Sequence, residues 1–83
     1  MKKHEIHEVV GAKSLHDYVV EFVFDDLTRG SVNLRPFLGR GVFRSLLDKK
    51  KFKQFKVDAE LGTLCWPNGA DIAPETLYHL AKK

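Results

Sequence analysis

Four histidines and one cysteine are the side chains best suited to metal binding, proton transfer or nucleophilic attack in this chain. His4 and His7 are three positions apart, an odd spacing, so they point to opposite faces of an extended strand and form a poor metal clamp. Only His79 is a candidate base for Cys65, while His16 lies where a strand begins. We therefore expect surface histidines, no catalytic residue, no metal and no cofactor, in a protein that is not an enzyme.

The size of the chain also argues against catalysis. With 83 residues it is predicted to be a single domain, 1–83, around one small core. A chain of this size buries only about 60–65% of its unfolded surface, which leaves little scaffold for a deep catalytic cleft. Gly39-Arg40-Gly41 lacks the pattern and the Lys-Ser/Thr ending of a nucleotide-binding loop.

Charge is distributed in three blocks of different sign. Residues 29–56 contain nine Lys and Arg side chains against one acid, Asp48, whereas residues 1–28 and 57–83 are each net acidic. Such a block attracts phosphate groups or an acidic partner surface, although a solvated surface is the simpler interpretation. The candidate contact residues are Arg35, Arg40, Arg44, Lys49, Lys50, Lys51, Lys53 and Lys56.

The N-terminal segment is basic, but the apolar stretch of a signal peptide does not follow it, and no long uncharged run suits a bilayer. We expect a cytoplasmic protein with no membrane partner.

Hydrophobic periodicity predicts the elements that position these side chains. An imperfect period of two predicts a strand near 5–10, with 11–14 as its connection. A much clearer alternation over 18–24 predicts a second strand whose even-numbered positions face the core. Gly30 can take a positive φ in the loop that follows, so 31–34 is predicted to pair back as a hairpin.

After Pro36 the pattern predicts a short amphipathic helix, a lysine-coated helical turn capped by Asp48, a second hairpin and a closing helix. These elements span 42–47, 49–55, 55–60 with 63–66, and 74–81.

This order, β-β-β-α-β-β-α, predicts an α+β fold. We expect a mainly antiparallel sheet, built from two hairpins plus an N-terminal strand, with the helices packed on one face. Aromatic side chains are predicted to supply much of the core, namely Tyr18, Phe22, Phe24, Phe43, Phe52, Phe55 and Trp66.

The segment 62–78 resembles the signature of a bacterial family known as domain of unknown function 2442. Its sharpest parts are the run WPNGAD and the helix opening PETLY, and looser similarity extends over nearly the whole chain. One departure is the loop after Phe24, where family members often have a tight Asp-Gly turn and this chain has Leu27-Thr28-Arg29 before Gly30.

The resemblance implies a small α+β domain without an assigned activity. Some relatives carry this domain ahead of a helix-turn-helix DNA-binding module, and many are encoded beside another small protein, as in toxin–antitoxin pairs. The resemblance thus implies a protein partner encoded nearby.

The residues of the signature are expected to be structural. Trp66 is predicted to anchor the last strand, Pro67 to end its pairing, and Asn68-Gly69 to take positive φ values. Asp71 is expected to hydrogen-bond backbone amides of the turn and to favour the helix that starts at Pro74. A ligand-binding role for Asn68 and Asp71 is the alternative.

Two functions remain open. The first is a non-enzymatic protein-binding module, the antitoxin-like or regulatory half of a two-protein system, which holds its partner through a strand edge or a helix rim. The second is a nucleic-acid-binding regulator that uses the basic segment 29–56.

Overall fold

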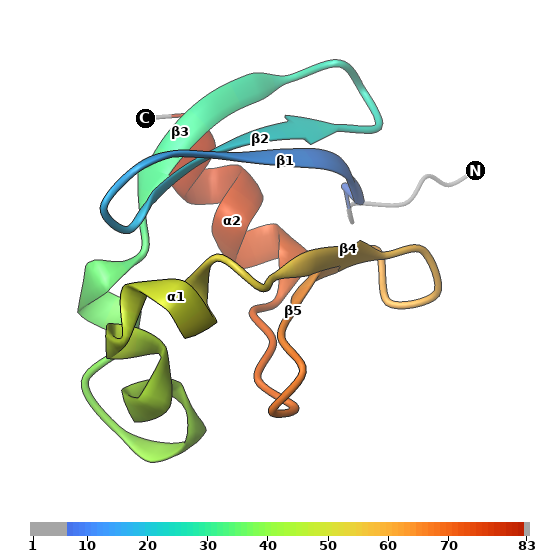
Figure 1. Ribbon diagram of the computed structural model, residues 1–83. Helices are drawn as coiled ribbons and strands as arrows, with labels where there is room; N and C mark the ends of the chain where they lie inside the picture. Colours follow the sequence, from blue (N-terminus) through green and yellow to red (C-terminus); the bar gives the residue numbers. More distant parts are fainter. Residues whose placement is uncertain (1–6, 83) are drawn as a thin grey trace.

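The computed structural model describes residues 7–82 and shows two antiparallel sheets, three short helices and one longer closing helix (Figure 1). The first sheet has the spatial order β1-β2-β3, and the second pairs β4 with β5. The α+β class and the predicted order of elements are confirmed. The bounds are β1 (Val9–His16), β2 (Val19–Phe24), β3 (Arg29–Asn33), η1 (Arg35–Phe37), η2 (Gly41–Leu47), α1 (Lys49–Phe52), β4 (Lys56–Asp58), β5 (Thr63–Cys65) and α2 (Pro74–Ala81), where η denotes a 3-10 helix.

Strand β2 has the two-residue period that the sequence predicts. Val20, Phe22 and Phe24 are fully buried, and the odd-numbered positions between them are only half-buried. Helix α2 lies across the inner face of this sheet (Figure 1) and inserts the buried Leu77 into the core. Burial of one face on each element accounts for the pairing of sheet and helix.

Gly30 is required for close packing and not, as predicted, for a positive φ. It takes no positive φ and lies within β3, opposite Phe22. A Cβ atom on it would lie 2.3 Å from the carbonyl oxygen of Ala81, so glycine is required because the end of α2 packs directly on the strand.

The first strand was predicted with the wrong bounds. Residues 11–14, expected to be a connection, belong to β1, which continues to His16 and turns at Asp17 and Tyr18. Two bulges, between Val9 and Gly11 and between Ser14 and His16, break the two-residue period, which is why the pattern did not reveal how far this strand extends. The part of the prediction at residues 5 and 6 lies outside the described residues.

The loop between β2 and β3 contains a strained residue. The amide of Phe24 donates to Thr28 O, the amide of Leu27 donates to Phe24 O, and Leu27 takes a φ of 73°. This is a three-residue hairpin loop that ends in the left-handed region, a position that glycine usually fills. The positive φ predicted in this loop therefore falls on Leu27.

An aromatic cluster joins the second sheet to the short helices. The indole Nε1 of Trp66 donates to the carbonyl oxygen of Phe52 at 2.8 Å, and the ring centroids of these two residues are 5.8 Å apart. Tyr18, Phe43 and Phe55 pack edge-on around this pair. Phe22, Phe24, Phe52 and Trp66 of the predicted core are buried, whereas Tyr18, Phe43 and Phe55 are half-buried against it.

The two sheets meet at the start of β1. The amide of Val9 donates to Gly62 O at 2.8 Å, and the amide of Asp25 donates to Glu8 O at 2.9 Å. The predicted sheet is thus divided into two, which this crossing segment ties together. Within residues 7–82, no helix is both long and apolar enough to cross a bilayer.

Trp66→Phe should lower the free energy of unfolding by about 2–4 kcal/mol, because it leaves the Phe52 carbonyl unpaired in the core and opens a small cavity. Phe55→Leu, which trims the same cluster without removing a donor, should cost less. Urea unfolding measures both, and equal losses would show that the hydrogen bond contributes little.

Leu27→Gly should raise the free energy of unfolding by about 0.5–1 kcal/mol, because glycine relieves the left-handed strain. The greater conformational entropy of glycine in the unfolded chain offsets part of that gain. The side chain of Leu27 is 83% exposed, so its removal costs little packing. Leu27→Ala keeps the strain and serves as the control. A Leu27→Gly variant no more stable than Leu27→Ala in the same urea titration would contradict the interpretation.

Candidate binding surface

The basic residues singled out in the sequence are all exposed, and most of them share one part of the molecule. Helices η1, η2 and α1 form a continuous body at the lower left of Figure 1, which we call the basic lobe (residues 35–53). Lys56 lies outside it, on β4. The other seven lie in the lobe, namely Arg35, Arg40, Arg44, Lys49, Lys50, Lys51 and Lys53.

One residue of the lobe is neutralised locally. The Nζ atom of Lys49 lies 2.8 Å from Asp17 Oδ1, and this hydrogen bond raises the pKa of Lys49 and lowers the pKa of Asp17. Among the residues that the structure describes, none of the other six cations of the lobe is in an ion pair. The lobe therefore presents several uncompensated positive charges to solvent.

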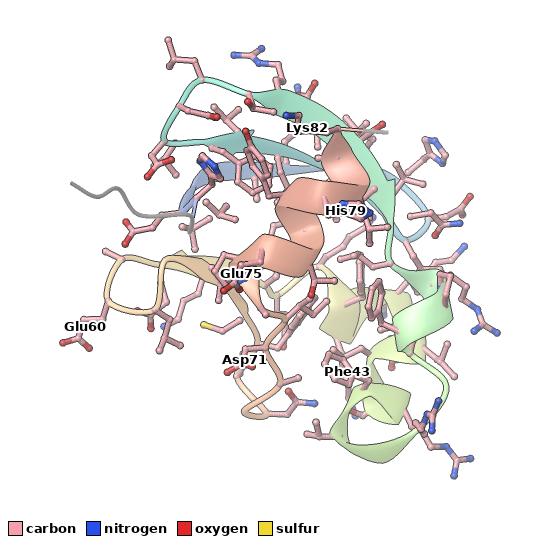
Figure 2. All side chains as sticks on the ribbon, turned by 180° about the vertical axis from the view of Figure 1, so that it is seen from behind. Phe43, Glu60, Asp71, Glu75, His79 and Lys82 are labelled. Carbon is pink, nitrogen blue, oxygen red and sulfur yellow. The ribbon has the colours of Figure 1, made fainter. Side chains whose placement is uncertain are left out.

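Three acidic residues lie away from the lobe. Asp25 and Asp26 lie in the β2–β3 loop, at the upper right of Figure 1, and Glu60 lies in the β4–β5 turn at the right. From behind, Figure 2 shows Glu60 on the opposite side of the molecule from Phe43 of η2. Asp25, Asp26 and Glu60 therefore lie away from the lobe, whereas Asp17 and Asp48 contact its lysine-rich helix.

The signature residues 66–70 form a hairpin loop beside the lobe. The amide of Gly69 donates to Trp66 O, the amide of Trp66 donates to Ala70 O, and Gly69 takes a φ of 92°. Of the two residues expected to have a positive φ, only Gly69 has one, because the loop combines an ordinary turn at Pro67-Asn68 with one left-handed residue.

The side chain of Asn68 fastens this loop to the lobe. Its Nδ2 donates to Val42 O at 3.0 Å and to Ser45 Oγ at 2.9 Å, while its Oδ1 accepts from the Ala70 amide at 3.0 Å. All three contacts are within the protein, so they assign Asn68 a structural task.

The expectation for Asp71 was wrong in its detail. Asp71 is exposed and pairs with Cys65 through an isolated backbone bridge. Within residues 7–82 its side chain makes no hydrogen bond to the turn, because Asn68 already binds the available amide. Helix α2 begins at Pro74, as expected, with Ala73 as N-cap and no side-chain cap.

A pocket of about 370 Å³ lies where the lobe meets this loop. It is open to solvent and brings together Lys51 of the basic set with Pro67 and Asn68 of the signature. The sequence did not predict this meeting, because Lys51 and Asn68 belong to elements that only tertiary packing joins. The pocket is lined by Ser45, Leu46, Lys51, Gln54, Pro67 and Asn68.

A cluster of His7, Asp25 and Asp26 beside the β2–β3 loop was not predicted from the sequence. The Nδ1 atom of His7 lies 3.8 Å from Asp25 Oδ1 and 3.6 Å from Asp26 Oδ2, and its ring stacks on Tyr78 at 3.9 Å between centroids. Tyr78 donates its hydroxyl to Asp26 Oδ2 at 2.6 Å, which, with the Thr28 amide, holds the pKa of Asp26 at about 2. His7, Asp25 and Asp26 offer three candidate metal-ligand atoms within 4.8 Å of one another.

Both oxygens of Asp26 already accept hydrogen bonds, and all three groups are partly exposed. We interpret the cluster as a set of structural contacts that fastens residue 7 and the β2–β3 loop to α2.

The other histidines stay apart. The Nδ1 atom of His16 lies 3.5 Å from Asp17 Oδ2, and His79 is exposed on α2. His4 lies outside the described residues. Over residues 7–82 no hydrogen bond joins Cys65 to His79, so the structure does not assemble the one nucleophile–base pair considered from the sequence.

Comparison with protein families gives a match. A family model described as "Protein of unknown function (DUF2442)" matches residues 9–83. No curated protein and no solved structure matches the chain.

The Asp26–Tyr78 bond should make stability depend on acid pH. The folded-state pKa of Asp26, about 2, lies below its ordinary value of 3.8, so the carboxylate stabilises the fold above pH 4 and loses this effect as pH falls toward 2. Tyr78→Phe removes the largest cause of the shift and should flatten the decline in the free energy of unfolding across this window. Urea titrations at a series of pH values measure it.

Tyr18→Phe is the matched control, because the Tyr18 hydroxyl binds the carbonyl of Leu47, which does not titrate. An unchanged pH slope in Tyr78→Phe would show that the bond does not hold the pKa of Asp26 down.

Proposed function

The chain belongs to the DUF2442 family of proteins of unknown function, and from that premise we propose that it is a non-enzymatic binding module whose basic lobe holds an acidic surface of a partner protein. The partner would be encoded nearby, with this chain as the antitoxin-like or regulatory half of the pair. The neighbouring small gene that the family resemblance implies supports this arrangement.

The observation that carries the proposal is the uneven surface charge. Six exposed cations of the lobe have no ion-pair partner within the described residues, while the acidic loops lie at the other end. An uneven charge distribution of this kind steers an acidic partner toward the lobe during approach and disfavours wrong docking poses.

The lobe also carries apolar side chains that suit a protein surface. On η2, Val42 is 48% exposed and lies between Arg40 and Arg44, and Leu47 is 36% exposed and lies just before the lysines. Arginine mixed with apolar contact area is typical of protein interfaces. The adjoining pocket is lined by one hydroxyl, Ser45, and one ionisable side chain, Lys51. Among the described residues Ser45 bonds Val42 and Asn68 rather than Lys51, so no nucleophile–base pair is assembled there, which favours binding over chemistry.

Nucleic-acid binding is the alternative, favoured by the run of lysines on α1. Two features make it the weaker candidate. Helix α1 has four residues, too few to read a groove. The aromatic rings of the lobe pack inward, Phe43 and Phe52 on Trp66 and Phe37 against the hydrophobic core, rather than offering a stacking platform.

Co-expression with the product of the adjacent gene tests the proposal. We expect a stable complex whose affinity falls with salt, and Arg40→Glu with Arg44→Glu should weaken it by at least about tenfold through charge reversal at the lobe. Lys13→Glu with Arg29→Glu makes the same change in net charge on the first sheet and should have a much smaller effect. Calorimetric titration measures both pairs.

Failure to form a complex would overturn the proposal. Fluorescence anisotropy with a labelled random duplex then tests the alternative. Duplex binding at low salt that the lobe variant abolishes, with no protein complex, would assign the lobe to nucleic acid instead.

A further inference from the structure

We infer that the pocket between the basic lobe and the 66–70 loop receives a carboxylate side chain, Asp or Glu, from the partner protein. This inference rests on the proposed function and specifies its point of anchorage. It assigns a ligand class to the pocket lined by Ser45, Leu46, Lys51, Gln54, Pro67 and Asn68.

The first argument is the supply of hydrogen-bond donors. Lys51 and Gln54 contribute an ammonium and an amide, and neither side chain makes a hydrogen bond to another residue of the described chain. Ser45 Oγ accepts from Asn68, and its own proton has only the Val42 carbonyl, 3.5 Å away. Rotation of that hydroxyl makes a third donor available to a ligand.

The second argument is the rigidity of the opposite wall. Both amide hydrogens of Asn68 are used within the protein, and its oxygen binds the Ala70 amide. Asn68 therefore does not contact the ligand as a donor but fixes the position of Ser45 relative to the loop. A wall held in place before binding loses little entropy when the ligand arrives.

The third argument is charge and size. Lys51 is the only charged residue in the lining, which suits a ligand with a single negative charge. The volume of about 370 Å³ leaves room for a carboxylate side chain to enter from solvent. Leu46 and Pro67 supply apolar walls for its methylene groups.

The exposed residues Val42 and Leu47 lie on the same helix as Ser45 and Leu46, so they can contact the partner around the anchored carboxylate. A nucleic-acid phosphate has no use for this apolar rim. The surroundings of the pocket thus favour an acidic protein segment.

A nuclear magnetic resonance titration of the ¹⁵N-labelled full chain tests the inference without the natural partner. The probe is a capped peptide, acetyl-Leu-Glu-Glu-Leu-amide, and its neutral counterpart contains Gln in place of Glu. We expect saturable shifts centred on Ser45, Lys51, Gln54 and Asn68 with the acidic peptide alone. Lys51→Met should weaken this binding by about tenfold, while Lys50→Met, on the same helix but outside the pocket lining, should change it by less than about twofold.

Equal binding of the two peptides, shifts spread over all the lysines, or equal effects of Lys51→Met and Lys50→Met would overturn the inference. Inorganic phosphate is titrated in parallel, and tighter binding of phosphate than of the peptide at the same residues would assign the pocket to phosphate groups. In the co-expressed complex, a partner that binds Lys51→Met as tightly as the unaltered chain would refute the anchor while leaving the proposed function intact.

Discussion

The hydrogen bond from Trp66 to the carbonyl of Phe52 is the interaction on which the candidate surface depends. It joins β5 to the end of α1 inside a cluster of packed rings, so the second sheet and the basic lobe become one body. Trp66 also opens the 66–70 loop, which means that its anchorage sets where Pro67 and Asn68 stand. A carbonyl left without a donor in this core would destabilise both walls of the pocket together.

The surface charges follow from the same construction. Asp48 caps α1 by accepting from the Lys50 amide, and Asp17 pairs with Lys49, so two acids help to hold the lysine-rich helix in place. The remaining cations of the lobe are not compensated in the part of the chain that the structure describes. Their positive charge remains available to attract an acidic partner, which links the local electrostatics to the proposed binding.

How far the sequence could predict these features depends on how local their causes are. The strict alternation in β2, the proline at the start of α2 and the turn at Pro67 are local, and each prediction is confirmed. Bulges concealed the extent of β1, because they disturb the period on which the pattern relies. The exposed lysines were identified from the sequence. That Lys51 lines a pocket together with Asn68 depends on the Trp66 contact, which no spacing along the chain reveals.

Hydrogen–deuterium exchange of the complex with the neighbouring gene product tests the central claim most directly. If the lobe and its pocket hold the partner, amides of residues 41–54 and 66–70 should exchange more slowly in the complex than in the free chain, while the β2–β3 loop stays unchanged. Protection confined to β1 and the β2–β3 loop, with the lobe exchanging as in the free protein, would contradict the account and move the interface to the acidic end.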